Sequence, residues 1–345
     1  MADAATTLDF EALGERIGAI LRRGGLSDLH ARALARVIAA GERDGAKSHG
    51  IYRIEGCLRT LKAGKVSPDA VPDLVDDGSG IIRVLAGGAF SPAAFALGVP
   101  RLAERARTHG LAALVLNDCV HFSALWPEVE ALADEGLAAL ALCPSYATVA
   151  PVGGTRPLLG TNPFAFAWPR PDGPPYVFDF ATSVAARGEI ELHRRAGRPL
   201  PEGWAIDEDG APTTDPAAAL AGAMLPFGGH KGSAISTMVE LLAGAMIGDL
   251  TSRGALDALG TTTLAPRHGE LILAFSPERF AAGRPGDPFA AGESLFAAIL
   301  AQGARLPSQR RFAARRSSER EGIALTADEV AMLDRLETLG LDAVS

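Results

Sequence analysis

Apolar residues recur at helical spacing near the start of the chain. Ser27 can cap a first helix, and Gly45 suits its C-terminal end. The apolar positions that this helix would bury are Leu34, Val37 and Ile38. A second helix is expected to begin near Ser48.

The middle of the chain alternates short apolar runs with turns rich in Gly, Pro and Asn, a pattern that predicts strands. These runs cover residues 112–116, 137–142, 164–167 and 271–275. Helical spacing returns over residues 231–248.

The C-terminal region reads as helical again. Thr326 and Glu329 have the spacing of a capping box, and they precede apolar positions at Val330, Leu333 and Leu336. Helices therefore flank a β-rich centre. This order predicts an α/β protein whose two ends pack together as one domain around an inserted one.

Composition and charge narrow the function classes. A length of 345 residues predicts about two domains at roughly 150 residues each. Hydrophobic residues make up 48% of the chain and charged residues 21%, which is typical of globular proteins and excludes a disordered tail. The net charge of −8 gives no support to binding of nucleic acid or of an anionic membrane. We therefore expect small molecules or protein as partners.

The cysteines indicate a reducing compartment. Cys57, Cys119 and Cys143 form no CxxC pair and leave one thiol over, so we expect the protein to be cytoplasmic. Acidic residues stand where a signal peptide needs positive charge, and no export segment is expected. The longest uncharged stretch, residues 136–155, is broken by prolines, so no membrane span is predicted.

Glycine-rich turns give a weak nucleotide signal. The nearest match to a Rossmann fingerprint, Gly78-Ser79-Gly80, has Arg83 where the third glycine belongs. The turn at residues 228–233 opens onto a helix N-terminus, where backbone N–H groups with His230 and Lys231 could hold a phosphate. The alternative is a glycine-rich entry turn with a solvated lysine.

His49 and Arg53 are spaced to share a helix face that is opposite an apolar stripe. An arginine can hold a substrate carboxylate while a nearby imidazole exchanges a proton. The alternative is a solvated polar face. Ser48 would be an N-cap, and a seryl nucleophile is not expected because adjacent side chains at a helix start do not face each other.

The segment His121-Phe122-Ser123-Ala124-Leu125-Trp126-Pro127 follows a predicted strand, at a loop position where binding residues collect. Trp126 could offer a flat wall to a ring, or it could be a buried aromatic beside a structural histidine. The histidines show no HExxH or other paired ligand spacing, so no metal site is predicted. Six arginines between Arg305 and Arg320 indicate either a solvated helix or a site for a nucleotide phosphate.

Five segments together resemble the malate/L-lactate dehydrogenase family that lacks a Rossmann fold. They are residues 43–50 (RDGAKSHG), the His121 segment, 160–163 (GTNP), 179–183 (DFATS) and 228–233 (GGHKGS). The resemblance spans nearly the whole chain. Within the family, residues 121–127 and 226–233 are closest to the Δ1-piperideine-2-carboxylate/Δ1-pyrroline-2-carboxylate reductases, because hydroxy-acid members usually carry small residues and Tyr after His-Phe-Gly.

The resemblance implies an α/β fold of its own, the non-Rossmann malate/L-lactate dehydrogenase-like fold, with a mostly antiparallel central sheet and flanking helices. It implies a discontinuous helical, substrate-binding domain from residues 1–116 and 287–345, and an NADPH-binding domain from residues 117–286. It also implies a homodimer with the site near the subunit interface.

Site residues follow from the resemblance by motif position. His49 would be the proton donor beside Ser48, and Glu189 stands where the imine reductases carry an Asp that completes the relay. The expected substrate-binding residues are Arg53, Thr161, Trp126, Arg187 and Gly188.

The resemblance also implies a cofactor site, for NADPH with NADH as the alternative. The expected cofactor-binding residues are His121, Phe122, Ser123, Ala124, Leu125, Asp179, Phe180, Ala181, His230, Lys231, Arg305, Arg310 and Arg311. Ser308 replaces the glycine that is usual in the last of these segments.

The function that these observations favour is NADPH-dependent reduction of Δ1-pyrroline-2-carboxylate and/or Δ1-piperideine-2-carboxylate to L-proline or L-pipecolate. The nearest alternative is a 2-hydroxy-acid dehydrogenase of the malate, lactate or ureidoglycolate type, in which His49 would protonate a carbonyl oxygen. A serine hydrolase or transferase that uses Ser48 and His49 is a further alternative, but the sequence contains no G-x-S-x-G elbow. A silent binding protein is disfavoured by the intact His49, Arg53 and Lys231.

Overall fold

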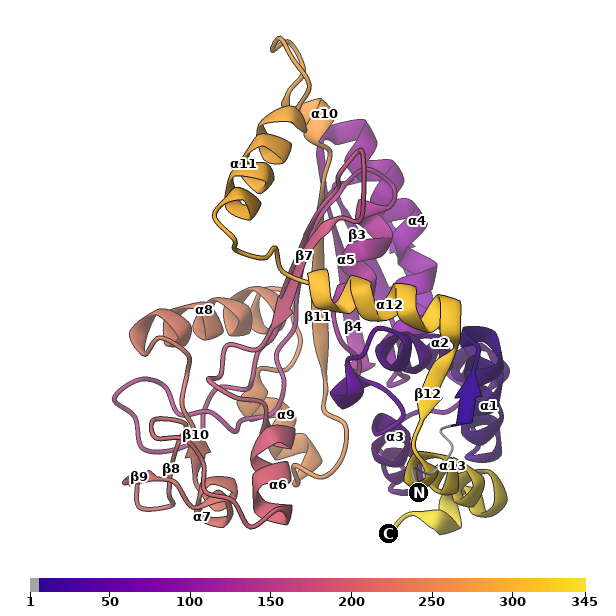
Figure 1. Cartoon of the computed structure of the whole chain (residues 1–345), viewed down its shortest axis with the longest axis vertical. Coiled ribbons are helices and arrows are strands. Elements are labelled where there is room, and N and C mark those ends of the chain that lie inside the picture. The colour runs from indigo at the N-terminus through magenta and orange to yellow at the C-terminus, as the bar shows by residue number, and fades with distance from the viewer. Residues whose placement is uncertain (1–5) are drawn as a thin grey trace.

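A seven-stranded sheet forms the centre of the molecule (Figure 1), in a computed structural model that describes residues 6–345. In spatial order its strands are β2 (Asp73–Asp76), β3 (Ile81–Leu85), β4 (Leu111–Val120), β11 (Arg267–Phe275), β5 (Ala138–Leu142), β6 (Phe164–Trp168) and β7 (Tyr176–Phe180). Only the β3–β4 pair of this sheet is parallel. The predicted α/β fold, with a mainly antiparallel sheet and flanking helices, is confirmed.

Successive side chains of a strand point to opposite faces of the sheet, so neighbouring residues of β11 pack against different helices. Ile272 and Ala274 of β11 pack into one core with α4 (Ser91–His109) and α5 (Trp126–Ala133). Leu271 faces the other side, where α8 (His230–Glu240) and the following π-helical turn η2 (Leu241–Ala245) pack. The sheet is therefore covered by helices on both faces.

The two ends of the chain form one helical layer beside the sheet, as the order of elements predicts. It contains α1 (Phe10–Arg23), α2 (Asp28–Arg43), α3 (Arg53–Lys62), α13 (Ala327–Leu339) and the short turn η3 (Gly340–Ala343), which share a core. β1 (Thr6–Leu8) pairs antiparallel with β12 (Ile323–Leu325). The predicted capping box of Thr326 and Glu329 is present. The expected domain boundary at residue 116 falls inside β4, and the division stays a prediction.

A smaller lobe lies at the lower left of Figure 1. It holds a three-stranded sheet of β8 (Ala205–Ile206), β9 (Pro212–Thr213) and β10 (Ala223–Met224), with α6 (Arg187–Arg195), α7 (Pro216–Ala221) and, nearby, α9 (Ser252–Leu259). The remaining helices are α10 (Pro277–Phe280), α11 (Ala290–Ala301) and α12 (Gln309–Glu321), and α12 crosses from the sheet to the helical layer.

The predicted helix from Ser48 is wrong in its start. Lys47–His49 form a separate 3-10 turn, η1, and α3 begins at Arg53. Gly50 between them has an extended ψ of −147°, which interrupts the helical path. The helix predicted over residues 231–248 is present as α8 and η2.

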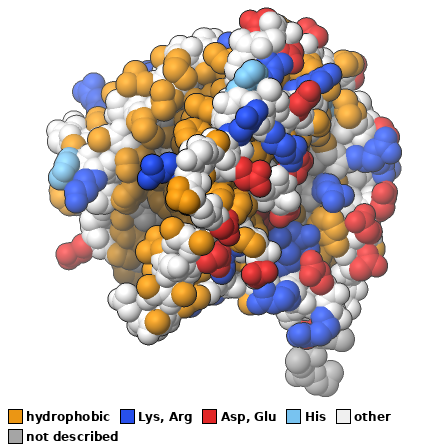
Figure 2. Space-filling view, turned by 90° about the horizontal axis from the view of Figure 1, so that it is seen from above, with side chains coloured by type: hydrophobic (Ala, Val, Ile, Leu, Met, Phe, Trp, Pro, Cys, Tyr) orange, Lys and Arg blue, Asp and Glu red, His pale blue; other side chains and the backbone are white. Residues whose placement is uncertain are grey.

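Hydrophobic and charged side chains gather on different sides of the surface. Seen from above, hydrophobic side chains surround a hollow on the side where α8 and α11 lie, and charged side chains cover the opposite side (Figure 2). No helix within residues 6–345 is long and apolar enough to cross a membrane.

Candidate active site

The 3-10 turn η1 brings Ser48, His49 and Arg53 together. Ser48 Oγ lies 3.1 Å from His49 Nδ1, and Arg53 Nε donates a hydrogen bond of 2.6 Å to the Ser48 carbonyl. The expectation that adjacent Ser48 and His49 side chains do not face each other is wrong, because a 3-10 turn and not an α-helix holds them. With Nδ1 taken by Ser48, Nε2 is the ring nitrogen left for a substrate.

Two residues of α2 fix the position of this turn. The Glu42 carboxylate accepts a hydrogen bond of 2.9 Å from the backbone N–H of Ile51. Gly41 lets the His49 backbone approach α2, since a Cβ on Gly41 would lie 2.4 Å from the His49 carbonyl oxygen. The imidazole is therefore placed by packing of its own backbone.

Aromatic rings line the same region. The guanidinium carbon of Arg53 lies 4.3 Å from the centre of the Phe122 ring. Gly56 on α3 makes room for that ring, because a Cβ there would lie 2.4 Å from Phe122 Cε1. The Trp126 ring meets His49 edge to face, at 6.3 Å between ring centres and 86° between planes.

Trp126 belongs to the core as well as to the surroundings of His49. Its side chain is 4% exposed and packs in the cluster between the sheet and α5. The guanidinium carbon of Arg311 lies 5.1 Å from the indole centre. The structure thus places Trp126 against His49, while its contact with a substrate ring stays a prediction.

Burial shifts the pKa values of both His49 and Arg53. Burial, assisted by the positive charge of Arg53, lowers the pKa of His49 from 6.5 to about 3, so the imidazole is neutral at pH 7. Burial also lowers the pKa of Arg53. Within residues 6–345 no carboxylate pairs with Arg53, whose one side-chain hydrogen bond goes to the Ser48 carbonyl. A half-buried cation without a counterion favours binding of an anion.

Tyr146 is a site residue that the sequence interpretation missed. The pKa of its phenol is raised by burial, and the positive charges of Arg187 and Arg53 oppose that rise, so Tyr146 lies near both arginines. Arg187 donates to the Leu220 carbonyl and to Thr262 Oγ1, both at 3.2 Å. The only available signal was the position of Tyr146 in the loop after β5.

The other predicted substrate and relay residues are not joined to His49 by any hydrogen bond in the described part of the chain. Glu189 and Gly188 are exposed in the first turn of α6. Thr161 is half-buried, and its carbonyl accepts hydrogen bonds from the N–H and the hydroxyl of Thr182. Their roles stay predictions.

Two of the predicted cofactor segments are joined through Asp179. Its carboxylate accepts hydrogen bonds of 2.9 Å from the backbone N–H groups of Leu125 and Trp126. Burial raises the pKa of Asp179 to about 6, and these hydrogen bonds limit the rise. The loop of residues 121–125 is thereby tied to the end of β7, where Phe180 and Ala181 follow.

The third cofactor segment lines an open groove of about 640 Å³ between α12 and the end of α2. Arg305 and Arg310 are exposed there and have no ion pair in the described residues. Arg311 is instead held by the buried Asp44 and by Glu130. Ser308 adopts a left-handed φ of 61°, the conformation that the usual glycine would favour.

His230 and Lys231 lie apart from this groove in sequence and in their contacts. They begin α8 after Gly228 and Gly229, whose φ angles are 57° and 61°. Both side chains are exposed, and neither makes a side-chain hydrogen bond or ion pair with another described residue.

These features fit a dinucleotide. The hydroxyl of Ser123 is buried without a hydrogen-bond partner in the described chain, so its loop offers a polar atom to a ligand. The groove supplies the unpaired guanidinium groups of Arg305 and Arg310 for a phosphate.

Comparison with known proteins identifies the family. The family described as malate/L-lactate dehydrogenase matches residues 8–334. The chain is 72% identical, over 99% of both chains, to a protein of Agrobacterium fabrum named Δ1-pyrroline-2-carboxylate reductase. It is 58% identical, over 89% of this chain and 92% of the other, to a Δ1-pyrroline-2-carboxylate/Δ1-piperideine-2-carboxylate reductase of Pseudomonas aeruginosa.

A solved structure agrees with these sequence matches. The crystal structure of Δ1-piperideine-2-carboxylate reductase from Pseudomonas syringae superimposes with a TM-score of 0.91 at 40% identity, covering 96% of this chain and 99% of that one. The chain belongs to the malate/L-lactate dehydrogenase family and, within it, to the branch whose members are named Δ1-pyrroline-2-carboxylate or Δ1-piperideine-2-carboxylate reductase.

Proposed function

We propose that this protein reduces the cyclic imino acids Δ1-pyrroline-2-carboxylate and/or Δ1-piperideine-2-carboxylate to L-proline or L-pipecolate, with NADPH as the reductant. The observation that carries the proposal is the desolvated Arg53, which has no carboxylate partner in the described residues and lies beside a neutral His49. The names of the relatives at 72% and 58% identity support the choice of substrate.

In this proposal each residue of the site has its own task. The terminal N–H groups of Arg53 hold the substrate carboxylate, and its Nε stays bonded to the Ser48 carbonyl. The bound carboxylate offsets the positive charge of Arg53, which is one cause of the low pKa of His49. The pKa of His49 therefore rises on substrate binding, and its Nε2 can hold a proton for the ring nitrogen.

The cofactor when bound supplies the hydride that reduces C2 of the C=N bond. The residues that would hold it are the loop of residues 121–125 with Asp179, and Arg305 and Arg310 of the groove. Phe122 and Trp126 exclude water from the side of Arg53 and His49, which strengthens the charge interactions there.

One assay tests the reaction. Oxidation of NADPH and NADH is followed with Δ1-pyrroline-2-carboxylate, Δ1-piperideine-2-carboxylate, pyruvate and oxaloacetate in parallel. The proposal expects turnover of at least one cyclic imine and none of the open-chain oxo acids at comparable rate. Turnover of pyruvate or oxaloacetate alone would instead establish the 2-hydroxy-acid dehydrogenase.

We expect Arg310→Ala to weaken NADPH binding about tenfold while NADH binding is unchanged, because one charge-assisted contact to a 2′-phosphate is lost, roughly 1.4 kcal/mol. Fluorescence titration of both cofactors measures this. Arg316→Ala, which removes an exposed arginine of the same helix outside the groove, is the matched control. Equal losses for NADH and NADPH would show that Arg310 does not contact the 2′-phosphate. Added salt should weaken NADPH binding more than NADH binding.

A second copy of the chain is the proposed protein partner. The outer face of β6 and β7 carries paired aromatic rings, with Phe164 and Phe180 at 4.7 Å and Phe166 and Phe178 at 5.7 Å between ring centres. The elements that pack beside these strands, α8 with η2 and α11, carry exposed apolar side chains at or next to them: Met238, Leu241, Met246, Leu295 and Leu300. Hydrophobic side chains gather on this side of the molecule in Figure 2. An apolar surface of this kind supports self-association.

Sedimentation should therefore give twice the mass of the chain, and Leu241→Asp should shift it toward the monomer. Leu29→Asp, at a leucine on α2 that is also more than half exposed, should not do so. A wild-type protein that sediments as a monomer would contradict the homodimer.

The three free, buried cysteines support a cytoplasmic location.

A further inference from the structure

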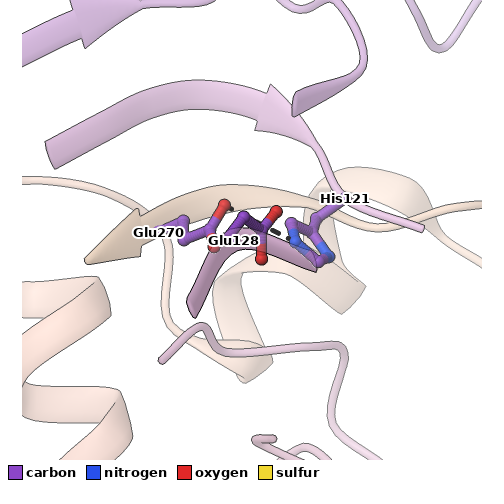
Figure 3. A group of neighbouring side chains, drawn as sticks. All are labelled: His121, Glu128 and Glu270. Atoms are coloured by element: carbon purple, nitrogen blue, oxygen red, sulfur yellow. Dashed lines mark ion pairs between the residues drawn. The ribbon is translucent and has the colours of Figure 1, made fainter. Parts of the chain in front are cut away.

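Two glutamates and a histidine meet where the proposed cofactor loop begins, and Figure 3 shows their side chains together. His121 follows β4, Glu128 lies in the first turn of α5, and Glu270 lies in the middle of β11. One nitrogen or oxygen of each side chain falls within 4.8 Å of the others, and His121 Nε2 is 3.5 Å from Glu270 Oε2. The side chains are buried, with Glu270 0% exposed.

No lysine or arginine of the described chain pairs with either glutamate. Both oxygens of Glu270, Oε2 of Glu128 and Nε2 of His121 are buried without a hydrogen-bond donor or acceptor assigned to them. Two ionised carboxylates side by side in such a place repel each other and lose their hydration. The pair therefore needs either a proton or a cation.

The small number of possible ligand atoms favours the proton. In the described chain the cluster offers three possible ligand atoms, which lie within 4.8 Å of one another, and a buried structural cation usually takes four or more. A hydrogen held between the two carboxyl groups removes one of the two charges without a further ligand. Burial is the main cause that raises the pKa of both Glu128 and Glu270, so the pair holds a proton at a pH where an exposed glutamate has lost it.

Within residues 6–345, the groups that face this pair supply no compensating positive charge. The other titratable groups that face this pair are His121, His268, Cys119, Cys143 and Asp179. Burial lowers the pKa values of His121 and His268, whose rings stack at 5.8 Å, and raises those of the two thiols. Asp179 adds negative charge, which raises the pKa of both glutamates further.

We propose that Glu128 and Glu270 share one proton, and that the single negative charge left on the pair accepts the Nε2 hydrogen of a neutral His121. This arrangement fixes the tautomer of His121, so that its Nδ1 is an acceptor. It also anchors the start of the loop of residues 121–125, as Asp179 anchors its end. Glu128 and Glu270 are thus positioning residues, and their effect on cofactor binding rests on the proposed function.

Thermal unfolding from pH 5 to pH 9 tests the shared proton. In the unfolded chain both glutamates lose their protons near the ordinary pKa of 4.5, but in the folded protein the pair keeps one proton to higher pH because burial raises the pKa of both carboxyls. The stability that it contributes is therefore full at low pH and falls as the pH rises through this window. We expect the melting temperature of the wild type to fall over this range, and Glu270→Gln and Glu128→Gln to flatten that fall. Glu319→Gln, at an exposed glutamate of α12, should keep the wild-type slope.

Nitrogen-15 spectra of protein labelled at histidine test the tautomer. Wild-type His121 should carry its hydrogen on Nε2 at pH 7, and Glu270→Gln should give a mixture of tautomers. In kinetics, Glu270→Gln should raise KM for NADPH about tenfold, a loss of roughly 1.4 kcal/mol, with kcat little changed. If the variants do not fold, the infrared band of a protonated carboxylic acid in the wild type at pH 7 decides for the shared proton, and its absence decides against it.

Other outcomes overturn the proposal. Unfolding curves of both glutamine variants that follow the Glu319→Gln slope would show that the pair holds no raised-pKa proton. One divalent cation per purified chain, whose chelation destabilises the wild type but not Glu270→Gln, would make the cluster a metal site. The unfolding and spectroscopic measurements use no substrate, so a failure of the proposed reaction would be seen separately in the imine assay.

Discussion

Arg53→Ala should lower kcat/KM for the cyclic imine by on the order of 10³-fold, because a desolvated charge pair worth about 4 kcal/mol is lost. The substrate carboxylate would then be buried without a cation, beside a histidine that is itself neutral. Steady-state kinetics with NADPH held at saturation measures the effect.

Two arginine variants make this result specific. Arg53→Lys keeps the charge but loses the planar fork and its stacking on Phe122, so it should recover only part of kcat/KM. Arg59→Ala removes another arginine of α3, one that pairs with Glu55, and should be close to the wild type. A kcat/KM for Arg53→Ala within tenfold of the wild type would place the carboxylate elsewhere, with Arg187 as the next residue to test.

His49→Ala should lower kcat by on the order of 10²-fold or more, the usual scale for loss of a positioned general acid. The protein should stay folded and bind NADPH as before, because His49 is held by its backbone against Gly41 and contributes no side-chain hydrogen bond beyond that to Ser48. Single-turnover measurements, with binding followed separately by fluorescence, isolate the chemical step.

Normal turnover of His49→Ala across the pH range would mean that His49 does not protonate the imine nitrogen. The proton would then come from solvent, or the substrate would bind already protonated, as the iminium. Ser48→Ala is the companion variant, since it removes the hydrogen bond to Nδ1 without removing the imidazole, and it should cost less than His49→Ala. Glu189→Gln tests the relay beyond the histidine. An unchanged kcat for Glu189→Gln would show that this exposed residue of α6 takes no part.

Local features of the fold could be predicted from the sequence, because the groups that create them are close in the chain. The capping box of Thr326 and Glu329 is one case, and the strands recognised from apolar runs in the centre are others. The break between His49 and Arg53 was not predictable in the same way. The helical pattern continues through Gly50, and only packing of that turn against Gly41 and Glu42 of α2 ends it.

The parts of the site that were missed depend on contacts between distant segments. Glu128 and Glu270 meet because α5 packs on the sheet that contains β11, and no spacing in the sequence shows this. The sequence could not distinguish among the arginines of residues 305–320, because each of them fits either a solvated helix or a phosphate site. The fold separates Arg311, which is paired with buried Asp44, from Arg305 and Arg310, which stay exposed.

Pairing of β1 with β12 determines when a newly made chain can complete its helical layer. The helices α1 and α2 are synthesised early, but β12, which pairs with β1, and α13, which packs on α1, follow much later in the chain. Glu329 of α13 also pairs with Lys47, next to Ser48. Asp44 likewise gains its ion pair with Arg315 only when α12 has been synthesised. Until β12 and α13 have been synthesised, the apolar residues of α1 lack part of their cover and Lys47, in the turn that carries His49, lacks its ion pair with Glu329. The turn that carries His49 is therefore completed only after β12 and α13 have been synthesised, and a chain terminated before Ile323 would expose Leu13, Ile17 and Ile20 to aggregation.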